Sequence, residues 1–127
     1  MDKSQREFLL ILSYLYIRYG KYDEALLLHR GLHEFFQNDS EILIGLSASL
    51  YFTSRPLEAI QHLEKLDGVE MSGQMEKLFF LLRSHVTWSV GRDSDARSDL
   101  IRYLGLEEKE IRAHEARGGK EVEDFLA

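Results

Sequence analysis

The chain repeats one pattern of apolar and small residues three times, and this repetition restricts the folds open to it. A shift of 34 residues superposes the first copy of the pattern on the second, and a shift of 37 superposes the second on the third. Two positions hold small residues in every copy: Ser13, Ser47 and Ser84 at the first, and Ala25, Ala59 and Ala96 at the second. Such a chain is expected to fold as an array in which each copy packs on its neighbours.

The spacing of apolar residues within each copy is typical of helices. Apolar residues recur every three or four positions, as at Leu9, Leu12 and Tyr16, whereas the strict alternation that half-buried strands need is hard to find. Pro56 is the single proline, so long stretches are free to be helical. The sequence therefore predicts an all-α fold with helices over 4–19, 22–37, 40–53, 56–66, 73–90 and 93–104.

Each copy reads as two helices joined by a short turn. The turns fall at Gly20, Ser54 and Gly91, residue types that tolerate the backbone bend ending a helix. The small residues of the pattern belong where the two helices of a pair cross, because only small side chains allow a close approach. The three extra residues of the second shift fit a loop over 67–73.

The last stretch of the chain has a different character, so we divide the sequence at residue 105. Residues 1–104 form the repeat domain (about 6–39, 40–73 and 74–104), and residues 105–127 form a charged helix or tail. A seventh helix is predicted over 106–117, with Gly118 and Gly119 as its stop. Residues 105–127 are either a frayed, solubilising end or a terminal helix with a role of its own. In the second case Ile111, Phe125 and Leu126 cap the last repeat or compete for a partner-binding groove.

A helix–turn–helix repeat of 34 residues resembles the tetratricopeptide family, most strongly over residues 20–25. The resemblance implies three hairpins stacked as a short right-handed superhelix, with the first helix of each pair on the inner, concave side. Arg83 stands where the other copies have leucine, and Asp93 stands where the first copy has Tyr22. These departures leave open a one-residue slip of the third hairpin.

By analogy with that family, a second apolar stripe on each first helix points into a groove. We call it the inner strip; it comprises Leu10, Tyr14, Ile17, Ile44, Ala48, Tyr51, Phe52, Leu78, Leu81, His85 and Trp88. It is either core, in an array that closes on itself, or an exposed strip that binds an amphipathic helix or extended segment of a partner. Its composition argues against a clamp for a peptide carboxylate, which needs Lys, Arg and Asn at these positions.

The sequence offers no convincing active site. His29 and His33 have the four-residue spacing of a helical metal site, but a third ligand is not obvious. His29 also aligns with Leu63 and Leu100, which are expected to face the core. No nucleophile elbow or phosphate-binding glycine loop is found, and the chain has no cysteine. We therefore expect no enzymatic activity, no metal and no cofactor.

The charge balance narrows the choice of partners. Sixteen basic and 22 acidic side chains give a formal net charge of −6, which argues against nucleic acid as a partner. The apolar runs are too short for a membrane span. A protein is the expected partner.

Small acidic proteins with three such repeats and an apolar groove resemble the tetratricopeptide chaperones of bacterial type III secretion. Residues 5–12, Gly20 and residues 25–28 are similar to the YscY family. That resemblance implies a cytoplasmic chaperone that holds a small, early-exported component of the YscX type and helps it reach the export gate. Related chaperones hold the needle subunit or the translocators. The alternative is a self-associating scaffold whose strip forms a homodimer.

Overall fold

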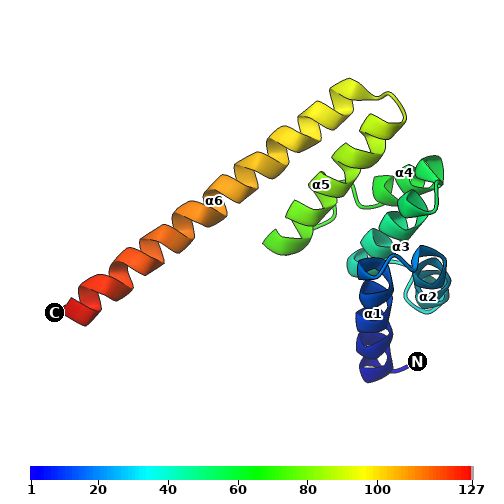
Figure 1. Ribbon diagram of the computed structural model, residues 1–127, viewed down its shortest axis with the longest axis horizontal. Helices are drawn as coiled ribbons and strands as arrows, with labels where there is room; N and C mark the ends of the chain where they lie inside the picture. Colours follow the sequence, from blue (N-terminus) through cyan, green and yellow to red (C-terminus); the bar gives the residue numbers. More distant parts are fainter. Residues whose placement is uncertain (127) are drawn as a thin grey trace.

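The computed structural model of the chain describes the backbone of residues 1–126 and the side chains of residues 1–118. The described backbone forms helices without strands: α1 (Lys3–Arg18), α2 (Tyr22–Phe35), α3 (Ser40–Phe52), α4 (Pro56–Glu64), α5 (Gly73–Ser89) and α6 (Asp93–Leu126). Consecutive helices pair as three hairpins, and each hairpin packs on the next (Figure 1). The predicted all-α fold is confirmed, and five of the six helices lie within a few residues of their predicted bounds.

Capping residues explain where several helices begin. Asp2 caps α1 by accepting the backbone N–H of Gln5 at 2.8 Å, and the Gln5 side chain accepts the backbone N–H of Asp2 in return. The Asp39 side chain caps α3 by accepting the backbone N–H groups of Glu41 and Ile42, and Ser72 caps α5. Pro56 occupies the first turn of α4, where its missing N–H costs nothing.

The turns inside the hairpins adopt the left-handed backbone conformation that ends a helix. The three residues expected at these turns have positive φ: 75° at Gly20, 66° at Ser54 and 80° at Gly91. Ser54 carries a Cβ, so this conformation costs the second hairpin roughly 1–2 kcal/mol that glycine avoids in the other two.

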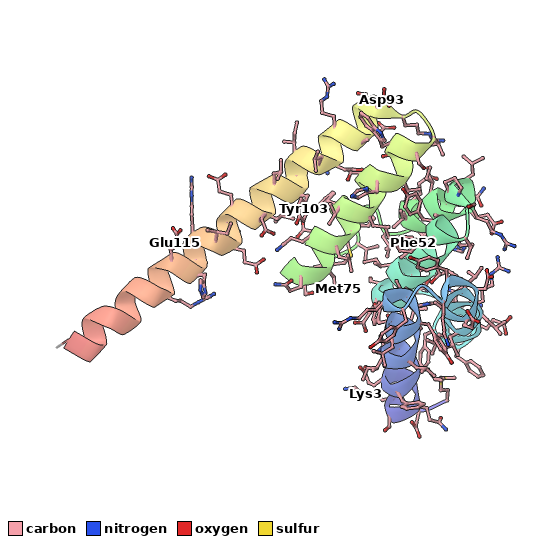
Figure 2. All side chains as sticks on the ribbon, viewed as in Figure 1. Lys3, Phe52, Met75, Asp93, Tyr103 and Glu115 are labelled. Atoms are coloured by element: carbon pink, nitrogen blue, oxygen red, sulfur yellow. The ribbon has the colours of Figure 1, made fainter. Side chains whose placement is uncertain are left out.

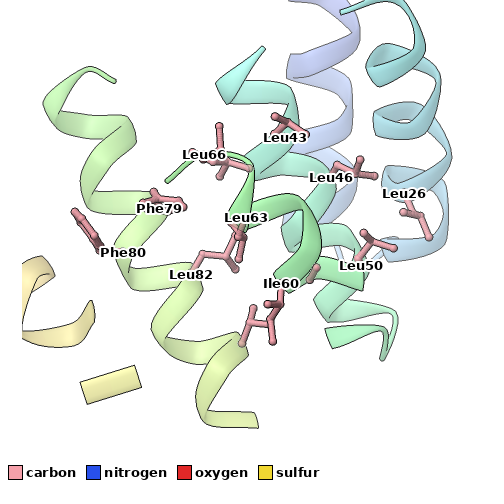
Figure 3. Packing of buried hydrophobic residues seen from close by; sticks show 13 residues of the cluster. Leu26, Leu43, Leu46, Leu50, Ile60, Leu63, Leu66, Phe79, Phe80 and Leu82 are labelled. Carbon is pink, nitrogen blue, oxygen red and sulfur yellow. The ribbon is translucent and has the colours of Figure 1, made fainter. Parts of the chain in front are cut away.

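The core lies between the hairpins and is centred on α3, α4 and α5 (Figure 3). The small residues of the repeat pattern are all buried, including Ser84 and Ala96 in the third hairpin. The third hairpin therefore keeps the register of the other two, without the one-residue slip that the sequence left open. Arg83 is accommodated because it donates two 2.8 Å hydrogen bonds to the buried Asp99 on α6 and one of 2.7 Å to Asp67 after α4.

The C-terminal part of the chain differs from the prediction. The expected end at residue 104, the separate helix over 106–117 and the stop at Gly118 and Gly119 are wrong, because α6 is a single helix of 34 residues. A glycine inside a helix costs only about 1 kcal/mol relative to alanine. No proline follows Gly105 or the pair Gly118 and Gly119 to end the helix. Beyond Gly105, Leu106 packs on the core and Glu110 accepts hydrogen bonds from Gln74 and Lys77 on α5.

The C-terminal turns of α6 extend beyond the N-terminal end of α5, which runs antiparallel to it (Figure 1). The segment 120–126, expected as a tail, is helical in the backbone. Ala127 and the side chains of Phe125 and Leu126 lie outside the described residues, so the suggested capping role of these two side chains stays a prediction. The division of the chain at residue 105 into two domains also stays a prediction.

A buried histidine joins the first two hairpins. His29 on α2 is fully buried, and its Nδ1 lies 3.0 Å from the carbonyl oxygen of Ala25. A carbonyl only accepts, so Nδ1 carries the proton. Nε2 lies 3.2 Å from the hydroxyl oxygen of Ser13 on α1, which donates its hydrogen to the Leu10 carbonyl at 2.8 Å. The Ser49 hydroxyl on α3 lies 3.3 Å from Nδ1. His29 is therefore a neutral residue enclosed in the core between α1 and α3.

The ring of His29 requires a glycine opposite it. A Cβ added at Gly45 on α3 would lie 2.1 Å from Nε2. We expect Gly45→Ala to lower the free energy of unfolding by about 1–3 kcal/mol, because the overlap forces the ring or the helix to move. Gly31→Ala on α2 is the matched control: its added Cβ meets nothing within 4 Å, so it should stabilise by about 0.5–1 kcal/mol. Urea unfolding measures both, and equal effects would contradict the steric argument.

The same histidine predicts how stability depends on pH. Burial lowers the pKa of His29, against the opposing effect of its hydrogen bond to Ala25. The unfolded chain, with a pKa of about 6.5, then binds more protons below that pH. The free energy of unfolding should therefore fall as the pH drops below about 6.5, with a slope of up to about 1.4 kcal/mol per pH unit from this residue.

His29→Leu tests this dependence, because Leu63 occupies the equivalent position of the second hairpin. The variant should lose less stability than the original protein between about pH 7 and about pH 5. Thermal melts at several pH values measure the difference. Parallel curves for the two proteins would show that His29 does not titrate on unfolding.

Candidate protein-binding site

The inner strip lies on α1, α3 and α5, the first helices of the three hairpins. Tertiary packing places these helices beside one another, since α3 contacts both α1 and α5. The strip residues therefore come from neighbouring helices and follow one side of the array. This arrangement arises from the repeat itself, because each first helix returns to the same side after its outer partner.

Exposure along the strip increases towards the third hairpin. Leu10 and Ile44 are buried in the two core clusters. They therefore belong to the core and offer no surface to a partner. The half-buried members are Tyr14, Ile17, Ala48, Tyr51 and Leu81, and the exposed ones are Phe52, Leu78, His85 and Trp88. The candidate surface is thus smaller than the sequence suggested, and it is concentrated on α5 and the end of α3.

The aromatic members of the strip differ in how firmly they are held. Phe52 stacks on Tyr22 of α2 with the ring centroids 4.7 Å apart, and Tyr51 packs against the core. Tyr14 packs edge-on against His29, and burial, assisted by the nearby Glu41, raises the pKa of its hydroxyl to about 12. Trp88 is 64% exposed and is the largest side chain available to a partner. Large exposed aromatic side chains of this kind dominate the energetics of protein interfaces.

A hollow of about 440 Å³ extends the exposed end of the strip from α5 to α6. The packed part of these two helices carries Met75 and Tyr103, whereas Glu115 lies on the projecting part of α6 (Figure 2). The hollow is lined by Ser84, His85, Trp88, Ala96, Arg97 and Leu100. Sequence reasoning missed its α6 wall, because Leu100 was expected in the core. Leu100 is instead 42% exposed.

Two histidines meet elsewhere, between the second helices of the first two hairpins. The rings of His33 on α2 and His62 on α4 are 5.5 Å apart, and the Nδ1 atoms of both are buried without a partner. Burial lowers the pKa of each, with further lowering by Lys65. The described residues contain no group of three side chains placed to hold a metal ion. The ring of His33 thus lies against that of His62, while His29 lies in the core as its alignment with Leu63 predicted.

The described helices also bear on the membrane question. Over residues 1–126, no helix combines the length and the apolar character that crossing a bilayer requires.

Comparison with known proteins finds the same architecture among solved structures. No protein-family model matches the sequence, and no curated protein matches it either. The fold is similar to that of the type III secretion translocator chaperone SycD from Yersinia enterocolitica, in a crystal structure described as an alternative dimer. The TM-score is 0.70 at 21% identity, over 96% of this chain and 92% of SycD. At this identity the likeness establishes a shared helical-hairpin fold.

Proposed function

We propose that this protein is a type III secretion chaperone that holds a secreted protein against the exposed part of the inner strip. The observation that carries the proposal is the set of large apolar side chains left open on the inner helices, above all Trp88 with Leu78 and Phe52. The shared fold with SycD, a translocator chaperone, supports the same class of function. Catalysis is not part of the proposal, since the strip holds no arrangement of nucleophile and base.

The proposed mechanism is passive burial of apolar surface. A secreted component that exposes amphipathic helices in the cytoplasm self-associates unless those faces are covered. A client helix laid on the strip buries its own apolar face and the side chains of Leu78 and Trp88 together. Each large side chain fully removed from water contributes about 1.5–3 kcal/mol, which offsets the cost of ordering the client segment.

Two client classes fit the proposal. The resemblance of residues 5–12 and 25–28 to the YscY family favours a small, early-exported component of the YscX type, delivered to the export gate. The fold likeness to SycD favours a translocator instead. The apolar strip would accept an amphipathic helix of either client, and equally one of a needle subunit.

The client is identified by purifying the protein from its native host and analysing the bound material by mass spectrometry. Trp88→Asp and Leu78→Asp each place a carboxylate in the exposed strip and should abolish co-purification of the client. Circular dichroism should stay unchanged, because both side chains are exposed. Leu57→Asp is the matched control: Leu57 is an exposed leucine on α4, outside the strip, and its variant should retain the client.

The control decides how the result is interpreted. Equal binding by the strip variants and the Leu57 variant would contradict a role for the strip. Loss of helicity in either strip variant would show that the side chain belongs to the core.

A further inference from the structure

The contact between successive hairpins uses the same positions of the first helix each time. In α3 these positions are Ile42, Gly45 and Ser49, and in α5 they are Phe79, Leu82 and Val86. All six residues are buried, because each first helix lays this face on the hairpin that precedes it. We call this face of a first helix its leading face.

Within residues 1–126, no hairpin covers the leading face of α1. The equivalent positions, found by the same shifts of 34 and 37 residues, are Phe8, Ile11 and Leu15. These residues are 65%, 59% and 43% exposed. A helix end of a solenoid normally carries polar residues on its outer face. Here the first helix carries the apolar residues of an internal contact.

At the opposite end of the array, the second helix of the third hairpin exposes the surface that would contact a following hairpin. The second helix of a hairpin contacts the next hairpin through residues that this contact buries. These residues are Leu26 and His29 in α2, and Ile60 and Leu63 in α4. The equivalents in α6 are Arg97 and Leu100, with Leu104 one turn further on. Both leucines are exposed, and in the part of the chain that the structure describes no fourth hairpin covers them. We call Leu100 and Leu104 the trailing face.

The charges at the two ends match in the same register. Between the first two hairpins, Tyr22 at the start of α2 stacks on Phe52 at the end of α3. The residue equivalent to Tyr22 in the third hairpin is Asp93, and the residue equivalent to Phe52 in the first hairpin is Arg18. Laying α1 of one copy on the third hairpin of another brings Asp93 to Arg18, so an ion pair takes the place of the stacked rings.

A second pair of charges follows the same rule. Arg6 on α1 bonds to Asp39 at 2.7 Å and lies 3.3 Å from Glu41, both of which belong to the next hairpin. Lys77, the equivalent of Arg6, already pairs at 2.5 Å with Glu107 and at 2.7 Å with Glu110, the equivalent of Asp39. The equivalent of Glu41 is Glu7 on α1, which a second copy supplies. Two opposite-charge pairs thus fall in register with the apolar contact.

We infer that the trailing face of one copy binds the leading face of a second copy, so that the array continues from chain to chain. The contact is heterologous, because the two copies use different surfaces, and it leaves one open face at each end of the assembly. Assembly therefore grows with concentration and has no fixed stoichiometry. Arg97 stands where Leu26 and Ile60 are buried, which makes this contact weaker than the internal ones.

Complementary variants of the full chain test the head-to-tail geometry. Leu15→Glu disables the leading face and Leu100→Glu disables the trailing face, and both residues are exposed enough to leave the fold intact. By sedimentation equilibrium, the average mass of the original protein should rise with concentration, while each variant alone stays monomeric. An equimolar mixture of the two variants retains one intact pair of faces and should form a dimer that grows no further.

Three results would overturn the proposal. The original protein could stay monomeric at its highest soluble concentration, Leu100→Glu could self-associate as the original protein does, or the mixture could stay monomeric. The second result would indicate a symmetric contact through α1 alone. Circular dichroism of each variant confirms that a change in mass does not come from unfolding.

A charge exchange tests the ion pair separately. Arg18→Asp should weaken self-association by about tenfold or more, because two carboxylates then face each other across the contact. Adding Asp93→Arg in the same chain should restore association to within about threefold of the original protein. A double variant as weak as the single one would place Arg18 and Asp93 apart. Neither residue belongs to the inner strip, so these results are independent of client binding.

Discussion

The burial of one face of α3 and of α5 against the preceding hairpin is the contact on which the rest of the structure depends. It unites three hairpins, none of which could bury its apolar residues alone, into a continuous core. It also places α1, α3 and α5 on one side of the array, and so creates the inner strip. The apolar side chains exposed along the strip and on the outer faces of the first and third hairpins follow from this stacking of three repeats within residues 1–126.

Much of the fold could be predicted because it is specified locally. The periodicity of Leu9, Leu12 and Tyr16 predicts a helix, and Gly20 and Gly91 adopt the left-handed turns that their residue type favours. The length of α6 could not be predicted from such signals. Gly105 is a weak helix former, but the packing of Leu106 and the pairing of Glu110 with α5 stabilise helix across it. Tertiary contacts outweigh local propensity there.

The composition of the candidate surface was harder to predict than the fold, because exposure depends on neighbours that periodicity does not identify. Leu10 and Trp88 both belong to the inner strip, yet Leu10 is buried beside Leu32 and Ile42 while Trp88 is largely open. Leu63 and Leu100 occupy equivalent positions of the repeat, and the difference between them is whether another hairpin follows. A repeat pattern thus predicts the direction of a side chain, whereas the number of repeats determines what covers it.

The straight course of α6 links these surfaces to one another. A chain that turned back after Leu104, as it does after Phe35 to begin α3, would lay its last segment over the trailing face and close the array. Continuing as helix leaves that face and the neighbouring hollow beside Trp88 uncovered within the part of the chain that the structure describes. A formal charge of −6 opposes close approach of two copies, and the local pairs at Asp93 and Lys77 act against that general repulsion. The two proposed contacts overlap at one residue, because Leu100 both lines the hollow beside Trp88 and belongs to the trailing face.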